Sequence, residues 1–158
     1  MKGLFILSSL LGLSVTLAFG QSDKEDIDIL QATYGKEKKE LVKDNLRVGK
    51  DSVNFWKVYD EYEVKRKGLA RERIELLRQY AESYEAMSGP TAAKIVSGTL
   101  DNDLKYTNLL QQYYTKFSST IGNVEAARLI YLEYYLQTLI KQRVQENLPG
   151  IKEIEKPR

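Results

Sequence analysis

The chain has 158 residues with 24 basic and 22 acidic side chains, so its net charge is only +2. It contains no His and no Cys, which excludes disulfides, thiol nucleophiles, Ser-His-Asp triads and the usual ligands of zinc, haem and copper. Charges of both signs are interspersed along the chain, so nucleic acid is not an expected partner.

The first twenty residues have the pattern of a secretory signal peptide. Lys2 supplies a positive start, residues 3–19 carry no charge, and Ala18-Phe19-Gly20 places small residues at a cleavage site before Gln21. The alternative is an uncleaved anchor, because the uncharged run nearly reaches the ~20 residues that span a bilayer. The polar residues that follow favour cleavage. We therefore expect a periplasmic protein without stable membrane insertion.

Residues 21–150 predict a single all-α domain of about four helices, followed by a flexible charged tail over residues 151–158. The first helix is expected over about residues 27–46, with a break at Gly35. The second runs over about residues 52–87 without a proline. At ~1.5 Å per residue it would be roughly 50 Å long, which predicts a helical hairpin or bundle.

The second helix carries an apolar row with alternating steps of three and four residues. Arg66 and Arg73 interrupt this row, either with stems on apolar surface and guanidinium groups reaching water or a Glu, or as part of a concave binding face. The first interpretation is favoured. The row consists of Phe55, Tyr59, Tyr62, Arg66, Leu69, Arg73, Leu76 or Leu77, Tyr80, Tyr84 and Met87.

Turn residues separate the remaining two helices. Gly89 and Pro90 suit a helix boundary, and Gly122 followed by Asn123 repeats this stop-and-restart pattern. The fourth helix, about residues 124–147, is apolar on more than one face, which is typical of a buried or partner-binding helix. The expected apolar side of the third helix comprises Val96, Leu100, Leu104, Leu110, Tyr114, Phe117 and Ile121.

Carboxylates are the main candidates for catalysis in a chain without His or Cys. Asp60, Glu61 and Glu63 cluster, but neighbours one and two positions apart on a helix point in different directions. We therefore expect a solvated face, with pairs Glu61–Lys65 and Glu63–Lys67, rather than an active site. No phosphate-binding glycine motif is present in residues 21–158, and we expect no enzyme activity, metal or cofactor.

The eleven tyrosines are the second unusual feature. Each single Tyr is more often a core residue, but Tyr and Arg are also favoured at protein interfaces. The adjacent pairs Tyr113-Tyr114 and Tyr134-Tyr135 cannot all face one core, so some should face a partner. The candidate protein-binding surface comprises Trp56, Tyr59, Tyr62, Arg66, Arg73, Tyr113 and Tyr134.

Short motifs resemble the Spy/CpxP-like family of small periplasmic helical proteins. They are NLRVGKDSVNFWKVYDEYEVKRK, YAESYEAMSG, IGNVEAARLIYLEYYLQTLI and LPGI, and they include an FW-x-x-Y-x-x-Y-x-x-x-R core followed by AAR-x-x-x-x-E. The family's LT-x-x-Q signature is absent, and LRVGKDS and MSGPTAA stand where it would fall. The resemblance implies a helical protein, a dimeric cradle, and ATP-independent chaperone or envelope-stress activity.

The leading prediction is a non-catalytic protein-binding protein, a homodimer that holds unfolded or envelope proteins. The alternative is a regulatory or structural protein that binds one specific envelope component. A carboxylate-based hydrolase is a third class, and it would need Asp60 or Glu63 buried beside another carboxylate.

Overall fold

The computed structural model describes residues 29, 36–48, 52–152 and 154. These residues form α2 (Lys38–Asn45), α3 (Ser52–Ser83), the 3-10 turn η1 (Tyr84–Ala86) and α4 (Gly89–Gln145). The all-α class is therefore confirmed for the described part of the chain. The expected count of four helices is not confirmed, because the third and fourth expected helices form the single long helix α4. The predicted signal peptide and residues 27, 28 and 30–35 of the first expected helix lie outside the described residues.

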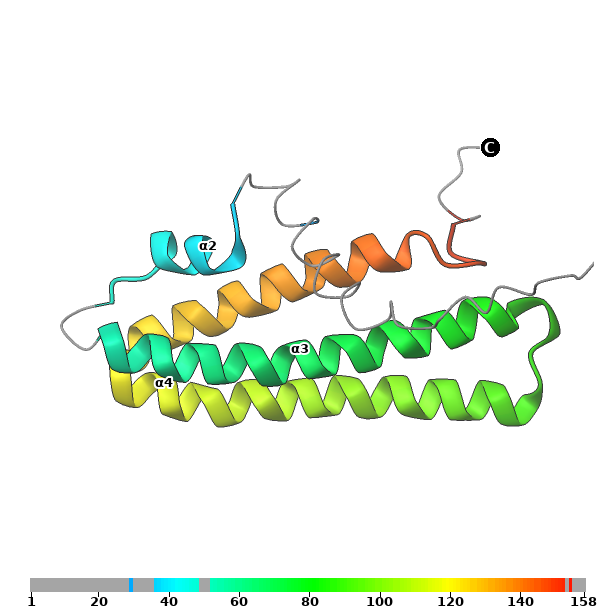
Figure 1. The fold of residues 1–158 in the computed structure, drawn as a ribbon, viewed down its shortest axis with the longest axis horizontal. Helices are drawn as coiled ribbons and strands as arrows, with labels where there is room; N and C mark the ends of the chain where they lie inside the picture. Colours follow the sequence, from blue (N-terminus) through cyan, green and yellow to red (C-terminus); the bar gives the residue numbers. More distant parts are fainter. Residues whose placement is uncertain (1–28, 30–35, 49–51, 153, 155–158) are drawn as a thin grey trace, which may run out of the picture.

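A tight connection turns α3 back into α4. Ser88 precedes α4, and its hydroxyl oxygen accepts a hydrogen bond from the backbone N–H of Thr91 at 3.2 Å. Pro90 follows at the second helical position, where its missing N–H leaves no bond unmade. As a result α3 and the start of α4 run side by side along the molecule (Figure 1).

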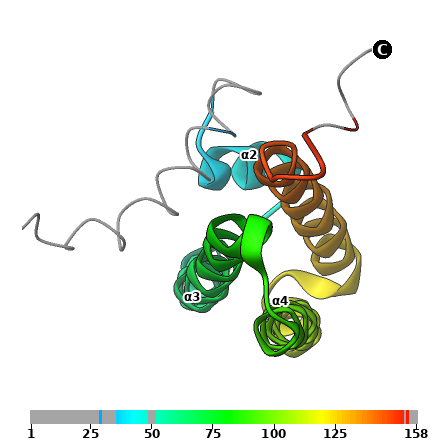
Figure 2. The ribbon, with the colours of Figure 1, turned by 90° about the vertical axis from the view of Figure 1, so that its right-hand side faces the viewer.

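Gly122 interrupts α4 with a single non-helical residue. Its φ of 80° and ψ of 159° lie in a region that essentially only glycine adopts. The chain bends sharply here, and the two parts of α4 run in different directions (Figure 1). We call residues 89–121 the first arm and residues 123–145 the second arm. Seen end-on, α3 and the two arms surround a common core, and α2 lies beside α3 and the second arm (Figure 2).

The main core is unusually rich in aromatic rings. Phe55, Tyr59 and Tyr62 of α3 are buried, as the spacing predicted, and they pack against Phe117 of the first arm at centroid distances of 5.8–6.3 Å. Short α2 covers one end of this cluster with Val42, which is fully buried.

The expected apolar side of the first arm was partly wrong. Val96, Leu100 and Leu104 are 57, 65 and 60 % exposed, and Tyr114 is exposed too. The buried row is displaced around the helix and contains Ile95, Asn102, Tyr106, Leu109, Leu110, Tyr113 and Phe117. The buried row shares Leu110 and Phe117 with the expected side, but Asn102 and two tyrosines interrupt its aliphatic residues. Asn102, for example, is buried because its side-chain amide donates to the Leu69 carbonyl at 3.0 Å.

The residues after α4 fold back onto the bundle. Ile151, expected in the flexible tail, is half-buried and lines a hollow of about 290 Å³ with Leu77, Ile95 and Leu148. Tyr80 of α3 donates a hydrogen bond to the Pro149 carbonyl at 3.3 Å. Nowhere in the described part of the chain is a helix both long and apolar enough to span a membrane.

Candidate functional site

The seven residues predicted as one binding surface do not share a surface. Five of them have at most 5 % of their area exposed: Tyr59, Tyr62, Arg66, Arg73 and Tyr113. Trp56 is half-buried, and only Tyr134, with 45 % exposure, lies on the outside. The prediction of a continuous surface from these residues is therefore wrong. The spacing of three and four that marked the α3 residues is the spacing of the helix's inner side.

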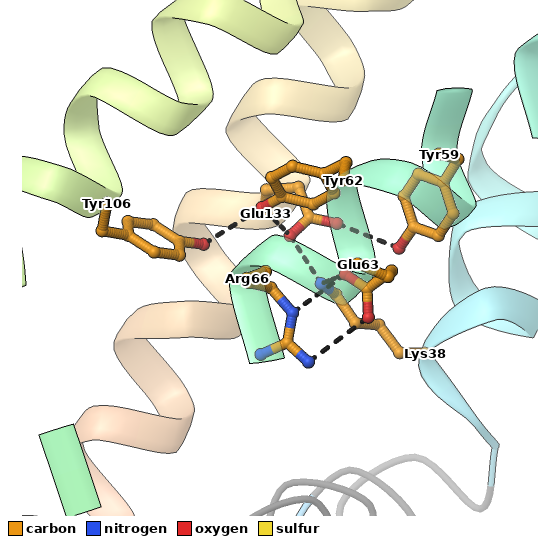
Figure 3. A network of polar contacts seen from close by, with 7 residues as sticks. All are labelled: Lys38, Tyr59, Tyr62, Glu63, Arg66, Tyr106 and Glu133. Atoms are coloured by element: carbon orange, nitrogen blue, oxygen red, sulfur yellow. Dashed lines mark hydrogen bonds and ion pairs between the residues drawn. The ribbon is translucent and has the colours of Figure 1, made fainter. Parts of the chain in front are cut away.

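A buried polar network takes the place of that surface (Figure 3). At its centre is Glu133 on the second arm, whose side chain is only 1 % exposed. Tyr59 donates to one carboxylate oxygen at 3.1 Å, and Tyr62 donates to the other at 2.8 Å. Tyr106 of the first arm lies 3.3 Å from the Tyr62 oxygen, and it acts as the donor because the Tyr62 proton is used on Glu133. The network thus joins α3 to both arms of α4.

Lys38 of α2 links two carboxylates within this network. Its ammonium group lies 2.6 Å from Glu63 Oε1 and 2.6 Å from Glu133 Oε2. The same nitrogen lies 5.4 Å from the ring centre of Tyr62, close enough for a cation–π contact. Only 11 % of the Lys38 side chain is exposed. One lysine therefore connects α2 to α3 and to the second arm.

Glu63 does not belong to a solvated face, contrary to the prediction. Its carboxylate accepts from Arg66 Nε at 2.9 Å as well as from Lys38, and only 17 % of its side chain is exposed. Asp60 and Glu61 do remain on the solvated face, at 58 and 49 % side-chain exposure. The expected partner of Glu61, Lys65, is replaced by Lys116 at 3.8 Å. For Arg66 the favoured interpretation holds, because its guanidinium reaches a Glu.

Burial and the neighbouring charges together set the protonation of Glu63 and of the three phenols in the network. Burial alone would raise the pKa of Glu63, but Lys38 and Arg66 outweigh burial and lower that pKa to about 2. Burial, with the charge of Glu133 second, raises the pKa of Tyr59 and Tyr62 well above the ordinary value. The pKa of Tyr106 is raised for the same two reasons. Glu63 is therefore a fixed anion and the three phenols are fixed hydrogen-bond donors near neutral pH.

Sequence reasoning missed the structural role of Glu133, although the sequence carries a signal for it. Glu133 is the only charged residue between Arg128 and Lys141, in a helix that is apolar on more than one side. A lone carboxylate in such a helix must find donors when the helix is buried. The donors come from Lys38, Tyr59 and Tyr62, which lie 71 to 95 residues away along the chain. No local pattern could name them.

A second feature lies on the outside of the second arm. Tyr131, Tyr134 and Tyr135 are 78, 45 and 59 % exposed, and Val124 is 67 % exposed. Tyr131 and Tyr135 lie seven and eleven residues after Val124, and Tyr134 lies three residues after Tyr131, so all four are on the same side of the helix. We call these four residues the outer tyrosine face. Val124 and Tyr131 also line a shallow hollow of about 700 Å³, together with Asn45, Asn123, Ala127, Arg128 and Leu132.

Neither feature has the ligands of a metal centre. Among the described residues, no three His, Cys, Asp or Glu side chains are grouped to hold a metal ion. Comparison with family models, with curated proteins and with solved structures gives no match for this chain. The resemblance to the Spy/CpxP-like family therefore stays a prediction.

Proposed function

We propose that this chain is an exported, non-catalytic protein-binding protein that uses the outer tyrosine face. The observation that carries the proposal is the exposure of Tyr131, Tyr134 and Tyr135 on one side of a helix. Tyrosine side chains provide large, rigid contact area with a polar hydroxyl, and they are enriched at protein interfaces. Isolated exposed apolar residues are common on soluble proteins, but a row of three tyrosines beside a hollow is a continuous contact area.

The mechanism would consist of weak contacts made without nucleotide. Tyrosine rings would cover apolar segments of an unfolded or envelope protein, and cations near the hollow would attract acidic ones. Arg128 lines that hollow with 54 % of its side chain exposed, and its guanidinium pairs with Glu125, whose side chain is 14 % exposed. The exposed part of the arginine would attract an acidic segment of a client beside the hollow. The signal peptide pattern of residues 1–20 supports a periplasmic location.

A homodimeric cradle belongs to the same proposal. The second arm is a mostly straight helix with apolar residues on its outer side, and a second copy would extend the tyrosine area around a two-fold axis. Sedimentation of residues 21–158 would measure the mass directly. A monomer at high concentration would rule out the cradle while leaving client binding on a single copy intact.

The buried pair Glu63 and Glu133 raises the alternative of a carboxylate-based hydrolase. Both carboxylates touch Lys38, so the arrangement required for that class is present. Its chemistry is nevertheless poor, because a general base works best with a pKa near the working pH. The pKa of Glu63 is about 2, since Lys38 and Arg66 outweigh its burial. The network is better suited to holding helices together.

Aggregation suppression by purified residues 21–158 tests the proposal. Light scattering of two unrelated unfolding proteins would be followed at rising molar ratio, without nucleotide. We expect both to be protected near equimolar ratio, and the double variant Tyr131→Ser/Tyr135→Ser to lose most of that protection. Tyr114→Ser is the matched control, because Tyr114 is exposed on the other arm of the same helix.

A dedicated partner would give a different result. Absence of protection from a well-folded sample would overturn general client binding. A single saturable complex in a pull-down from envelope extract, lost in the double variant, would then assign the same face to one specific envelope component.

A further inference from the structure

We propose that the hollow of about 290 Å³ at the end of the bundle opposite α2 binds the acyl chain of a fatty acid (Figure 1). Residues of α3, of the start of the first arm and of the segment after α4 surround this hollow. The outer tyrosine face lies on the second arm and shares no residue with it. The inference therefore does not depend on the proposed function.

The lining of the hollow complements hydrocarbon. Of its eight described lining residues none is charged, and all but Tyr80 and Thr99 are aliphatic. These two already donate their hydroxyl protons, Tyr80 to the Pro149 carbonyl at 3.3 Å and Thr99 to the Ile95 carbonyl at 2.9 Å. A peptide segment would bring backbone carbonyls, and neither lining hydroxyl has a proton left to donate to them. Burial of unpaired carbonyls is unfavourable, whereas an alkyl chain carries no such group.

The volume of the hollow also matches an alkyl chain. A methylene group is close in size to a water molecule, whose share of liquid volume is about 30 Å³, so the hollow holds about ten methylenes. This is more than the side chain of a leucine or a phenylalanine provides. A single side chain of a partner protein would leave part of the space empty and forfeit contacts with the lining. The chain of a medium-length fatty acid fills it.

The hollow opens to the surface at the first arm. Val96 and Leu100 on its rim are 57 and 65 % exposed, whereas Ile95 is only 5 % exposed. A chain that enters over this rim covers apolar surface that water now contacts, which favours binding. Lys152 directly follows Ile151 of the lining and is exposed, so its positive charge complements a carboxylate at the mouth of the hollow.

Isothermal titration calorimetry with octanoate, decanoate, dodecanoate and tetradecanoate tests the proposal. The protein would be residues 21–158, which contain every helix that the structure describes, and each acid would stay below its micelle-forming concentration. We expect one ligand per chain. The affinity should rise about fourfold for each added methylene and level off at about ten carbons, where the hollow is full.

Variants at exposed positions locate the bound chain. Val96→Ser/Leu100→Ser removes the apolar rim and should weaken decanoate binding at least fivefold. Leu104→Ser is the matched control, because Leu104 is 60 % exposed on the same arm and does not line the hollow. Its affinity for decanoate should stay within about twofold of that of the wild-type chain, since it loses no contact with the ligand.

A second pair of variants locates the carboxylate. Lys152→Gln should weaken decanoate binding about threefold, because the head group loses its nearest cation. Lys57→Gln makes the same change of charge at an exposed position near the start of α3 and should have no effect.

Several results would overturn the proposal. An affinity that keeps rising through tetradecanoate, uptake without saturation, or equal weakening by Leu104→Ser would indicate adsorption on apolar surface instead of filling of the hollow. Absence of heat with every acid would exclude the ligand class. Equal weakening by both lysine variants would show attraction by the overall charge and remove the carboxylate from the mouth of the hollow.

Discussion

The two ends of the bundle are built differently. At one end α2 covers Phe55, Tyr59, Tyr62 and Phe117, and the network holds Glu133 at 1 % exposure. At the other end Leu77, Tyr80 and Ile95 meet the residues after α4 around a hollow of about 290 Å³. We call the end covered by α2 the network end, and the end where the residues after α4 pack the hollow end.

The difference shows how a short helix can stabilise one end of a bundle. At the network end α2 adds a cation and apolar side chains to an interior that already holds carboxylates and phenols. Those polar groups would be unfavourable if they were unpaired. At the hollow end Val96 and Leu100 stay exposed beside the hollow, and the interior contains fewer charged groups that need partners. The network end should therefore respond strongly to single substitutions, and the hollow end weakly.

The largest expected effect comes from Glu133→Ala at the network end. The change removes the acceptor of Lys38, Tyr59 and Tyr62 and leaves these groups buried without it. Breaking a buried ion pair by removing one partner lowers the free energy of unfolding by about 3–5 kcal/mol. Urea unfolding followed by circular dichroism would measure this. Glu82→Ala, at an exposed position in α3, should change stability by less than about 0.5 kcal/mol.

The sequence predicted the parts of the fold that local pattern determines. The class, the long α3 and the interruption at Gly122 all follow from spacing and from Gly and Pro positions. The network could not be predicted, because Glu63 looked like a surface residue between other acids. Lys38 and Glu133 lie 25 and 70 residues from Glu63 along the chain, and only the packing of α2 and the second arm against α3 brings them beside it. The burial of Asn102 and Tyr113 was missed for the same reason, because each side chain contacts α3 from the first arm.

The second largest effect is expected at alkaline pH, which should lower the free energy of unfolding through the phenols of the network end. The phenols of Tyr59, Tyr62 and Tyr106 have raised pKa values in the folded state, mainly because they are buried. Above about pH 10 the unfolded chain releases these protons first, so the free energy of unfolding falls as pH rises. Each phenol contributes a slope that rises toward about 1.4 kcal/mol per pH unit as the unfolded phenol becomes fully ionised. Urea titrations between pH 9 and 11 would give the slope of the free energy of unfolding against pH. Tyr106→Phe should reduce this slope by about the contribution of one phenol. An unchanged slope would contradict the assignment.

Acid pH should also lower the free energy of unfolding at the network end, because Glu63 becomes protonated. Its pKa in the folded state is about 2, because Lys38 and Arg66 outweigh its burial. Its contribution is complete above the unfolded pKa of about 4.3 and is lost as pH falls toward 2. The loss should reach at most about 3 kcal/mol. Glu63→Gln should flatten stability over this interval of pH.

Glu75 toward the hollow end is the matched control for Glu63. Hydrogen bonds from Arg78 and Gln79 lower its pKa to about 2 as well, but its side chain is about half exposed. Solvent screens exposed pairs, so Glu75→Gln should leave the acid profile of the wild-type chain nearly unchanged. Equal flattening by both variants would show that burial does not distinguish the two ends.

A smaller effect is expected at the bend between the arms. Gly122→Ala forces a side chain onto a φ of 80° and a ψ of 159°, which should destabilise the chain by roughly 1–3 kcal/mol. Gly68→Ala is the matched comparison, because Gly68 lies inside α3 and no atom would lie within 4 Å of an added Cβ. That variant should gain about 0.5–1 kcal/mol, since Ala favours the helix. Thermal melting of both variants would show opposite shifts.

The smallest effect is expected at the hollow end. Val96→Ser/Leu100→Ser removes apolar side chains that are 57 and 65 % exposed, so little burial is lost and no buried polar group loses a partner. The free energy of unfolding should change by no more than about 0.5 kcal/mol per site. Urea unfolding measures this under the conditions used for Glu133→Ala. A loss of several kcal/mol would mean that this row is buried in solution against a second copy, and the stability of the wild-type chain would then rise with protein concentration.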